Sequence, residues 1–568
     1  MEKKKEINYI RILVLCLWVI GAVKVLFVGY DMDEQYALAM SYRMTQGDFL
    51  VYNMWEPHQT SGFLMALFML PYLMITGGTT GIALYVRICG LICHTVIHGL
   101  LYKTLRTYLH KDHSLLVCGI SFFALPKLMF LPEFANMQIW FLLLTCICLL
   151  KYYGAESVKE SRGNIWFLIM AGFFTAMEVL TYPSTIFVFA TVLIIIVIFR
   201  GRKTLLKELA AYILPCVVSA GVFFGILLSK IPVSDLKFLL GQVMSDGSHR
   251  TTPGEWIVRH GLSTLKILGF LAVYAVVATV IYFIMKKIRK NADIKLLWPK
   301  LWIATALVGQ VLIWLFGSDY PNFPSVEYMM VPVLLLPIII GKKLKKSPVL
   351  AFLVAVPFMA FPGVLLFSNH PLMASLPFLG SCVTGILALP EMGALFAQET
   401  EKNQYKALSM KAILFLWLLV IIFGKGYMMR TSQGSHYTIL DETSLCRQGV
   451  AMGLVADTAG AERNRDVNNL IKEVLPEGAK VFYIGKCPDV YLQNDMEVCT
   501  PSTISTPTYD DNVYVYFDLY PEKEPDYVII DSGFAYLPEG EWARNYLAEH
   551  YEETPIAENF YIKIYARK

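Results

Sequence analysis

The stretch that decides the fold is DMDEQYALAM, residues 31–40, which closely follows an apolar run over residues 10–28. The run is long enough to cross a membrane, since a spanning helix needs about 20 mostly apolar residues. Asp31, Asp33 and Glu34 therefore stand where the chain leaves the lipid. Like charges repel one another and acids near lipid are costly, so the cluster calls for a function.

The composition of the whole chain indicates a membrane protein. Of its 568 residues 56% are hydrophobic, and the mean hydropathy is +0.51, whereas soluble domains are about 45–50% apolar. The formal charge of +4 is close to balance and the sequence has no nucleic-acid-binding motif, so no nucleic-acid partner is expected. The 11 cysteines are scattered without the spacing of a metal site. These features predict a polytopic, mainly α-helical membrane protein.

Thirteen apolar segments are predicted to span the membrane. They begin near Ile10, Ile82, Ser114, Asn136, Ile165, Ile186, Ala210, Leu265, Leu301, Glu327, Val349, Met373 and Ala412. A further segment, residues 61–75, is shorter and contains Pro71. If it spanned, the lysine-rich loops that follow would all lie outside, against the positive-inside rule. We therefore expect it to form a juxtamembrane or re-entrant helix on the outer face.

The N-terminus is predicted to lie in the cytoplasm, because basic residues precede the first apolar run. A signal peptide also begins in this way, but the run is long enough to span and no small-residue cleavage site closes it. With an odd number of spans in the cytoplasmic membrane, the C-terminus then lies outside.

Residues 430–568 differ in kind from the membrane part, residues 1–429, because they are polar and mixed. Strands are expected at 479–485, 525–531 and 560–567, and amphipathic helices at 465–475 and 541–551. This alternation predicts a small extracytoplasmic α/β domain of about 135 residues, a normal domain size. Cys487 and Cys499 would face an oxidising space there, and a disulfide between them is one outcome.

Polar residues gather in the outer loops of this topology, above all in residues 29–81 and 230–264. The inner loops contain no nucleotide-binding glycine motif, and nucleotide sugars are not available on the outer face. An enzyme there needs an activated substrate that has already crossed the membrane, and a lipid-linked sugar meets that need. Transfer from a lipid phosphate requires a base for the acceptor hydroxyl and cationic support for the leaving phosphate.

The two long outer loops supply candidates for both tasks. A carboxylate held at the interface beside another acid is expected to have a raised pKa, which suits a base. His249, Arg250 and Arg259 are the candidates for the lipid phosphate, because a guanidinium can bind two phosphate oxygens at once. A solvated loop is the alternative for His249 and Arg250.

The first loop carries an ordered set of residues behind the first membrane helix: Asp33-Glu34, Tyr36, Gly47-Asp48 and EPHQTSGFL at 56–64. This set resembles the first extracytoplasmic loop of the GT-C glycosyltransferases, in the branch of the protein mannosyltransferases and lipid A aminoarabinose transferases. The resemblance implies the GT-C fold, with an odd number of spans, outer juxtamembrane helices and often an extracytoplasmic C-terminal domain. It also implies that Asp33 is the base or positions the acceptor hydroxyl, and that Glu34 supports it.

Other residues of the outer loops are expected to bind substrate. They are Asp31, Tyr36, His58, Glu133 and Glu327. The alternatives are an acidic cap on the next helix for Asp33 and Glu34, capping of a turn for Glu133, and a structural role at the interface for His58. The chain departs from the family at residues 57–59, where Pro-His-Gln replaces Pro-Pro or Pro-Leu, and in the weak match of Glu133 to an acid of the second outer loop. Because family members differ in metal requirement, a divalent cation such as Mg²⁺ or Mn²⁺ is left open.

The predicted function is transfer of a sugar from a polyprenyl-phosphate donor to an acceptor outside the cytoplasmic membrane, with inversion at the anomeric carbon. The acceptor is expected to be a cell-envelope glycan, polymer or lipid, since the lysine-rich sequence looks bacterial. Two alternatives stay open. One is a polymerase or ligase of lipid-linked oligosaccharides, and the other is a non-enzymatic transporter of lipid or glycan.

Overall fold

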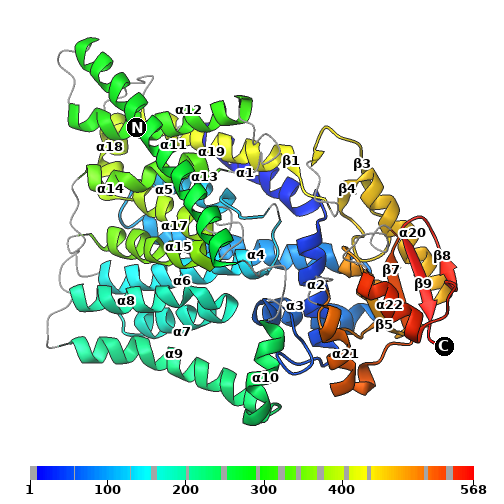
Figure 1. Cartoon of the computed structure of the whole chain (residues 1–568). Helices are drawn as coiled ribbons and strands as arrows, with labels where there is room; N and C mark the ends of the chain where they lie inside the picture. The colour runs from blue at the N-terminus through cyan, green and yellow to red at the C-terminus, as the bar shows by residue number, and fades with distance from the viewer. Residues whose placement is uncertain are drawn as a thin grey trace.

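The computed structural model describes residues 9–56, 58–127, 129–154, 163–199, 204–244, 252–288, 294–316, 326–340, 347–367, 376–401, 409–431, 437–504, 509–532 and 541–568. Over these residues the chain forms a large bundle of apolar helices and a smaller C-terminal part built on a mixed sheet (Figure 1). Two short helices of the first outer loop, α2 and α3, lie between the two parts (Figure 1).

A helix occurs at each of the thirteen places where a span is predicted. The bundle comprises α1 (Tyr9–Phe27), α4 (Ile82–Leu105), α5 (Lys111–Phe123), α6 (Phe134–Tyr153), α7 (Trp166–Thr181), α8 (Ile186–Phe199), α9 (Leu205–Leu228), α11 (Pro253–Ile288), α12 (Ile294–Phe316), α13 (Glu327–Met330), α14 (Leu336–Ile339), α15 (Val356–Phe367) after a π-helical turn (Leu350–Ala355), α17 (Leu376–Leu387), α18 (Pro390–Glu401) and α19 (Met410–Tyr427). The buried residues of these helices form one large apolar core.

By length and composition, 7 helices of the described chain can cross a membrane, or up to 8 if the bent pair α17 and α18 forms one span. The chain is therefore a multi-span membrane protein, and the number thirteen stays a prediction. One of the seven is Gln59–Thr76, which joins a 3-10 turn (Gln59–Ser61) to α3 (Gly62–Thr76). This helix passes the same test of length and composition as the other six, so the juxtamembrane placement from loop charge stays a prediction.

The second long outer loop is more helical than predicted. Residues 230–264 include α10 (Val233–Val243) and the first turns of α11, which begins at Pro253 rather than near Leu265. At 1.5 Å per residue the 36 residues of α11 extend about 54 Å, well beyond the ~30 Å hydrocarbon thickness of a bilayer. The polar sequence GEWIVRHG is thus the end of a long helix, which hydropathy alone did not reveal.

Helix α2 (Met32–Thr45) begins at the acidic cluster for a local reason. Asp31 is its N-cap, and its Oδ1 accepts the Glu34 amide at 2.9 Å. Asp33 and Glu34 occupy the first turn, where negative charge suits the helix dipole. Ten consecutive residues from Glu34 to Arg43 are buried, so the helix is enclosed by the bundle and the C-terminal part.

The C-terminal part contains a five-stranded sheet in the order β6-β5-β7-β9-β8. Its strands are β5 (Lys480–Ile484), β6 (Glu497–Val498), β7 (Tyr527–Asp531), β8 (Ala557–Glu558) and β9 (Ile562–Ala566), and its helices are α20 (Thr458–Val474), α21 (Tyr509–Leu519) and α22 (Glu541–His550). Strands β6, β5 and β7 are parallel, whereas β9 and β8 are antiparallel to their neighbours. The three predicted strands and two predicted helices are confirmed. Two small antiparallel pairs precede the sheet: β1 (Met428–Met429) with β2 (Tyr437–Thr438), and β3 (Thr443–Leu445) with β4 (Val455–Asp457).

The two faces of the sheet contact different elements, because alternate residues of a strand point to opposite sides. Val481 and Tyr483 of β5 pack with α20, whereas Phe482 and Ile484 pack with α21 and α22. The first face continues without a break into α2, α3 and α4, whose buried residues share one apolar cluster with it. The predicted boundary near residue 429 thus separates two kinds of structure but not two separate cores.

The predicted option of a Cys487–Cys499 disulfide is wrong, because both residues are buried cysteines that form no disulfide. Burial raises the pKa of Cys499 to about 12, so the group stays a thiol rather than the thiolate that reacts.

Candidate functional site

Asp33 lies at the centre of a cluster of charges brought together from distant parts of the chain. Its Oδ2 is 3.3 Å from Lys127 Nζ, in the loop before α6, and 3.0 Å from Arg430 Nη2, just after α19. The Asp33 side chain is 37% exposed, so it remains open to other molecules. An exposed carboxylate between two cations is the first feature of a reactive site.

The electrostatics of Asp33 differ from the expectation for a crowded acid. The Lys127 ammonium, and after it the Arg430 guanidinium, hold the pKa of Asp33 well below its usual range. The predicted raised pKa is therefore wrong for Asp33 in this state, because opposite charges outweigh the neighbouring acids. Asp33 is a stable carboxylate as long as both cations are in place.

Lys127 connects Asp33 to the start of α6. Its Nζ lies 3.4 Å from Glu133 Oε2 and 4.4 Å from the centroid of the Phe134 ring. Glu133 is also the N-cap of α6 and accepts the backbone N–H groups of Ala135 and Asn136. The capping alternative for Glu133 is thus confirmed, while its second contact brings it to within reach of Asp33.

Arg430 connects the same acids to the last helix of the bundle. Its Nε is 2.5 Å from Asp31 Oδ2, so one guanidinium holds both Asp31 and Asp33. The backbone supports this contact, because Tyr30 pairs with Thr431 and the Tyr30 amide donates to the Arg430 carbonyl at 3.1 Å. Asp31 therefore caps α2 and fixes Arg430 at once.

Glu34 points away from this cluster. Both of its oxygens accept from the Arg87 guanidinium of α4, at 2.6 and 2.5 Å, and the pair is buried. Arg87 also donates to the carbonyls of Leu26 and Gly29. This geometry fixes α2 against α1 and α4, and it supports Asp33 through the backbone rather than by direct contact.

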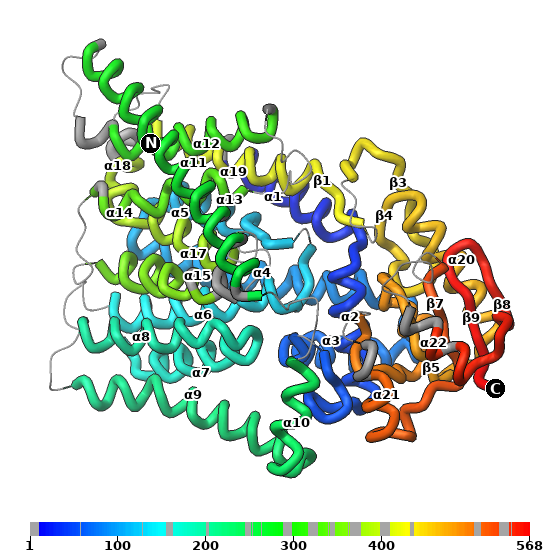
Figure 2. The backbone as a smooth tube through the Cα atoms, in the orientation of Figure 1, coloured from blue at the N-terminus to red at the C-terminus, as the bar shows by residue number. Residues whose placement is uncertain are grey.

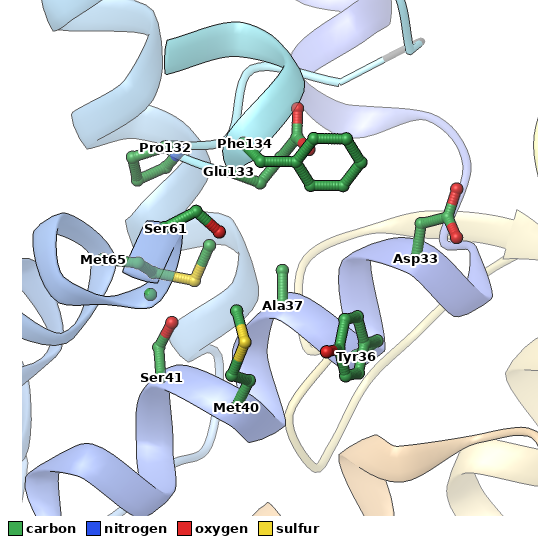
Figure 3. A pocket seen from close by; sticks show the side chains of 11 residues that line it. Asp33, Tyr36, Ala37, Met40, Ser41, Ser61, Met65, Pro132, Glu133 and Phe134 are labelled. Atoms are coloured by element: carbon green, nitrogen blue, oxygen red, sulfur yellow. The ribbon is translucent and has the colours of Figure 1, made fainter. Parts of the chain in front are cut away.

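A small pocket begins at Asp33 and runs between α2, α3 and the start of α6 (Figure 3). It is lined by Asp33, Tyr36, Ala37, Met40, Ser41, Ser61, Gly62, Met65, Pro132, Glu133 and Phe134. The structure thus brings three predicted site residues, Asp33, Tyr36 and Glu133, to one cavity. Its lining segments belong to the first loop that resembles the GT-C proteins and to the outer turn before α6.

His58 lies behind this pocket. Its ring stacks on Phe134 at a centroid distance of 4.3 Å and on Tyr182 at 5.4 Å. Lys127 and His58 thus both contact the ring of Phe134. The backbone of His58 is left-handed, with φ of 60°, which is uncommon for a residue with a side chain.

A second charged cluster in the first loop accounts for Gly47-Asp48 and the Glu56 that opens EPHQTSGFL. Arg43 donates to Asp48 at 2.8 Å, to Glu56 at 2.9 Å and to three backbone carbonyls, two of them in the C-terminal part. Lys523 joins from the C-terminal part, 2.8 Å from Asp48. These motif residues attach the C-terminal part to the first loop and do not line the pocket.

Several predicted site residues cannot be placed at this site. His249 and Arg250 lie outside the described residues, and the side chains of Arg259, on α11, and Glu327, on α13, also lie outside them. Within the described part of the chain, no group of three or more His, Cys, Asp or Glu residues has the arrangement of a metal site.

The sequence prediction did not identify Lys127, Arg430 or Arg87, although a weak signal exists for the first two. In a topology that keeps most lysines inside, Lys127 and Arg430 are cations on the outer side, and each lies next to the end of a predicted span. Arg87 lies near the N-terminal end of α4, and its role follows only from its contacts with Glu34 and with the carbonyls of Leu26 and Gly29.

No protein-family model and no curated protein matches the sequence. Solved structures do match. ArnT from Cupriavidus metallidurans in the apo state aligns with a TM-score of 0.51 and 9% identity over 98% of each chain. The chain has a fold similar to that of ArnT.

A second structure of ArnT from Cupriavidus metallidurans, bound to undecaprenyl phosphate, aligns over 98% of each chain with a TM-score of 0.47 and 11% identity. ArnT is a GT-C lipid A aminoarabinose transferase. The apo structure, with its TM-score of 0.51 over 98% of each chain, confirms the resemblance predicted from the first loop at the level of the fold, and that alignment includes the C-terminal part.

Proposed function

We propose that the chain is a membrane glycosyltransferase that moves a sugar from a polyprenyl-phosphate donor to an acceptor on the outer face of the cytoplasmic membrane. The observation that carries the proposal is the exposed Asp33 carboxylate, held by Lys127 and Arg430 at the edge of a pocket. The site thus offers a base and two phosphate-binding cations side by side. The ArnT-like fold supports the same class of protein.

In the proposed reaction Asp33 accepts the proton of the acceptor hydroxyl as that oxygen attacks the anomeric carbon. The bond from this carbon to the phosphate oxygen breaks, and polyprenyl phosphate leaves with the bonding electron pair. A single displacement of this kind inverts the anomeric carbon. Asp31 and Glu133 hold Arg430 and Lys127 in position, and their side chains are buried whereas that of Asp33 is exposed, so Asp33 is the acid that can meet the acceptor.

The low pKa of Asp33 gives the cations a second role. A donor phosphate that binds Lys127 and Arg430 competes with Asp33 for both groups, since charge-assisted contacts to phosphate are strong. As those cations turn to the phosphate, the influence that lowers the pKa of Asp33 weakens. Donor binding would therefore convert a stable carboxylate into a better base.

The remaining sequence expectations enter the proposal as further parts. His249, Arg250 and Arg259 would add positive charge around the lipid phosphate, while Tyr36, His58 and Glu327 would contact the sugar or acceptor. The N-terminus would face the cytoplasm and the C-terminal part the outside, where a cell-envelope glycan, polymer or lipid is the acceptor. A divalent cation could assist, although Lys127 already lies between Asp33 and Glu133.

The test is transfer of radiolabelled sugar from a panel of polyprenyl-phosphate sugars by membranes that contain wild type or Asp33→Asn. We expect Asp33→Asn to reduce transfer by about 10²–10⁴-fold, the usual contribution of a general base. The matched control is Asp235→Asn, which removes an exposed carboxylate from the outer helix α10. This control should transfer at the wild-type rate.

Transfer that survives in Asp33→Asn, with both variants present at equal amounts, would contradict the role of the base. No transfer by wild type with any donor, in membranes where another transferase works, would contradict the proposed function itself.

A further inference from the structure

Ser41 presents an unused hydroxyl to the pocket behind Asp33. The residue is fully buried and is one of those that line the pocket, and its Oγ has no hydrogen-bond partner among the described residues. A buried polar group without a partner is costly, because it has lost its hydrogen bonds to water. A bound molecule that reaches Ser41 could supply that partner.

Ser41 lies about two helical turns beyond Asp33 on α2. Asp33, Ala37 and Ser41 follow one another at intervals of four on α2, so they share one face of the helix. Eight residues of α-helix extend about 12 Å. Figure 3 shows Asp33 at one end of the pocket residues and Ser41 with Ser61 at the other. A pyranose with its anomeric carbon near Asp33 would direct a distant substituent at Ser41.

Among the polar groups at this end of the pocket, the Ser41 hydroxyl is the one available to bind that substituent. Ser61 Oγ already donates to the His58 carbonyl at 2.8 Å, and the walls next to Ser41 are the apolar side chains of Met40 and Met65. The inner end of the pocket therefore has apolar walls and one free hydroxyl. This suits a single hydroxyl or amino group on a carbon ring.

Gly62, the first residue of α3, packs closely against this end of the pocket. A Cβ at this position would lie 2.9 Å from Met44 Cε and 3.3 Å from Ser41 Oγ. Any larger residue would therefore displace Met44 or move against the Ser41 hydroxyl. The absence of a side chain at Gly62 lets Ser41 keep its position at the pocket.

We infer that this pocket is a subsite for the transferred sugar, in which Ser41 recognises one hydroxyl or amino substituent far from the anomeric carbon. The inference rests on the proposed function and identifies the residue that selects the sugar. Ser41 is a specificity residue here, and the chemistry at the anomeric carbon belongs to Asp33.

The experiment compares polyprenyl-phosphate hexoses with deoxy analogues that lack one hydroxyl each. Wild type should favour one parent donor over one of its deoxy analogues by about 10–100-fold in kcat/KM, since an unpaired buried group penalises the analogue. Ser41→Ala should reduce that ratio to less than about threefold. The matched control is Ser234→Ala, which removes an exposed hydroxyl from α10, outside the pocket lining, and should keep the wild-type ratio.

The outcomes separate the subsite from the proposed function. If wild type transfers sugar and Ser41→Ala keeps the wild-type ratio, the subsite is overturned and the function stands. If wild type transfers nothing, the thermal unfolding midpoint is measured with the same donors. A donor that stabilises wild type but not Ser41→Ala supports the subsite without transfer, and equal shifts overturn it. If Ser41→Ala does not fold, Ser41→Cys, which keeps the volume and weakens the hydrogen bond, replaces it.

Discussion

The first outer loop contains two clusters built from the same kinds of residue, and they differ in what they leave unsatisfied. Around Arg43, the side chains of Arg43, Asp48 and Glu56 are at most 2% exposed, and the guanidinium makes five hydrogen bonds. Around Asp33, the carboxylate is 37% exposed and Arg430 is 33% exposed. One cluster is closed to further partners, and the other still has room for them.

The difference separates structural charge from functional charge in a loop whose motif residues contribute to both. A buried network that is fully satisfied holds its parts in one arrangement, but it cannot bind anything without being broken. A partly exposed network can exchange one of its ion pairs for a ligand. Asp33 and Asp48 are both motif acids, and only their surroundings tell these roles apart.

The largest expected effect is on stability, from Arg43→Met. Breaking a buried ion-pair network by removing one partner costs about 3–5 kcal/mol, because Asp48 and Glu56 stay buried without their cation. Thermal unfolding of the detergent-solubilised protein, followed by tryptophan fluorescence, measures the loss. An unchanged unfolding midpoint would show that the Arg43 cluster is not structural and would remove the contrast with the Asp33 cluster.

Lys127→Met is expected to act on activity instead. Losing one of two phosphate-binding cations should reduce kcat/KM by about 10–100-fold while the protein folds normally, since removing a single electrostatic stabiliser of a transition state costs about 10²-fold or somewhat less in a partly exposed site. Lys472→Met, on the exposed face of α20, is the control and should retain wild-type transfer.

The same variant should also move the pH profile. Lys127 lowers the pKa of Asp33, so its removal raises that pKa, and a base works only in its ionised form. The acid limb of kcat/KM should therefore shift to higher pH by about 1 unit. The same lowered pKa makes stability depend on pH. The ion pairs of Asp33 stabilise the fold above the pKa that Asp33 has in the unfolded chain, and this stabilisation is lost as the pH falls through the lower pKa of the folded state. An acid limb unchanged in Lys127→Met would argue against Asp33 as the base.

A smaller effect on the free energy of unfolding is expected from the contact between Asp48 and Lys523 in the Arg43 cluster. The two groups are 2.8 Å apart and their side chains are 2% and 9% exposed. A double-mutant cycle with Asp48→Asn and Lys523→Met should give a coupling energy of about 1–3 kcal/mol, the range for charged groups in contact. Additive losses of stability would mean that this contact does not attach the C-terminal part to the first loop.

The smallest effect is expected from removal of divalent cations. Lys127 Nζ lies 3.3 Å from Asp33 and 3.4 Å from Glu133, between two acids that a metal could otherwise bridge. Addition of EDTA to the transfer assay should change the rate by less than about twofold, because the ammonium already supplies the positive charge. A loss of transfer that Mg²⁺ or Mn²⁺ restores would show that a metal completes the site.

The sequence was sufficient to predict the features that depend on local pattern. Apolar runs predicted where helices occur, and alternation in residues 479–485, 525–531 and 560–567 predicted the principal strands of the sheet. The order of residues in the first loop predicted the ArnT-like fold. Asp33, Tyr36 and Glu133 were predicted as site residues, and they meet at one pocket.

Features that depend on contacts between distant segments were not predictable in the same way. The pKa of Asp33 was expected to rise because only its acidic neighbours were visible in sequence, whereas its cations come 94 and 397 residues later. The roles of Glu34 and Asp48 likewise depend on Arg87 and Lys523. In each case the missing information was a partner from another segment rather than the chemistry of the residue itself.

The contact of the first membrane helix with the last has a consequence for how the protein is made. Helices α1 and α19 lie side by side (Figure 2). Lys24 of α1 donates to the carbonyls of Lys425 and Met428 near the end of α19, and Arg430 then reaches Asp31 and Asp33. A nascent chain therefore carries an incomplete site during nearly the whole of its insertion into the bilayer. Arg430 reaches Asp31 and Asp33 only after α19 has been inserted beside α1, so the charge cluster is completed at the end of membrane insertion.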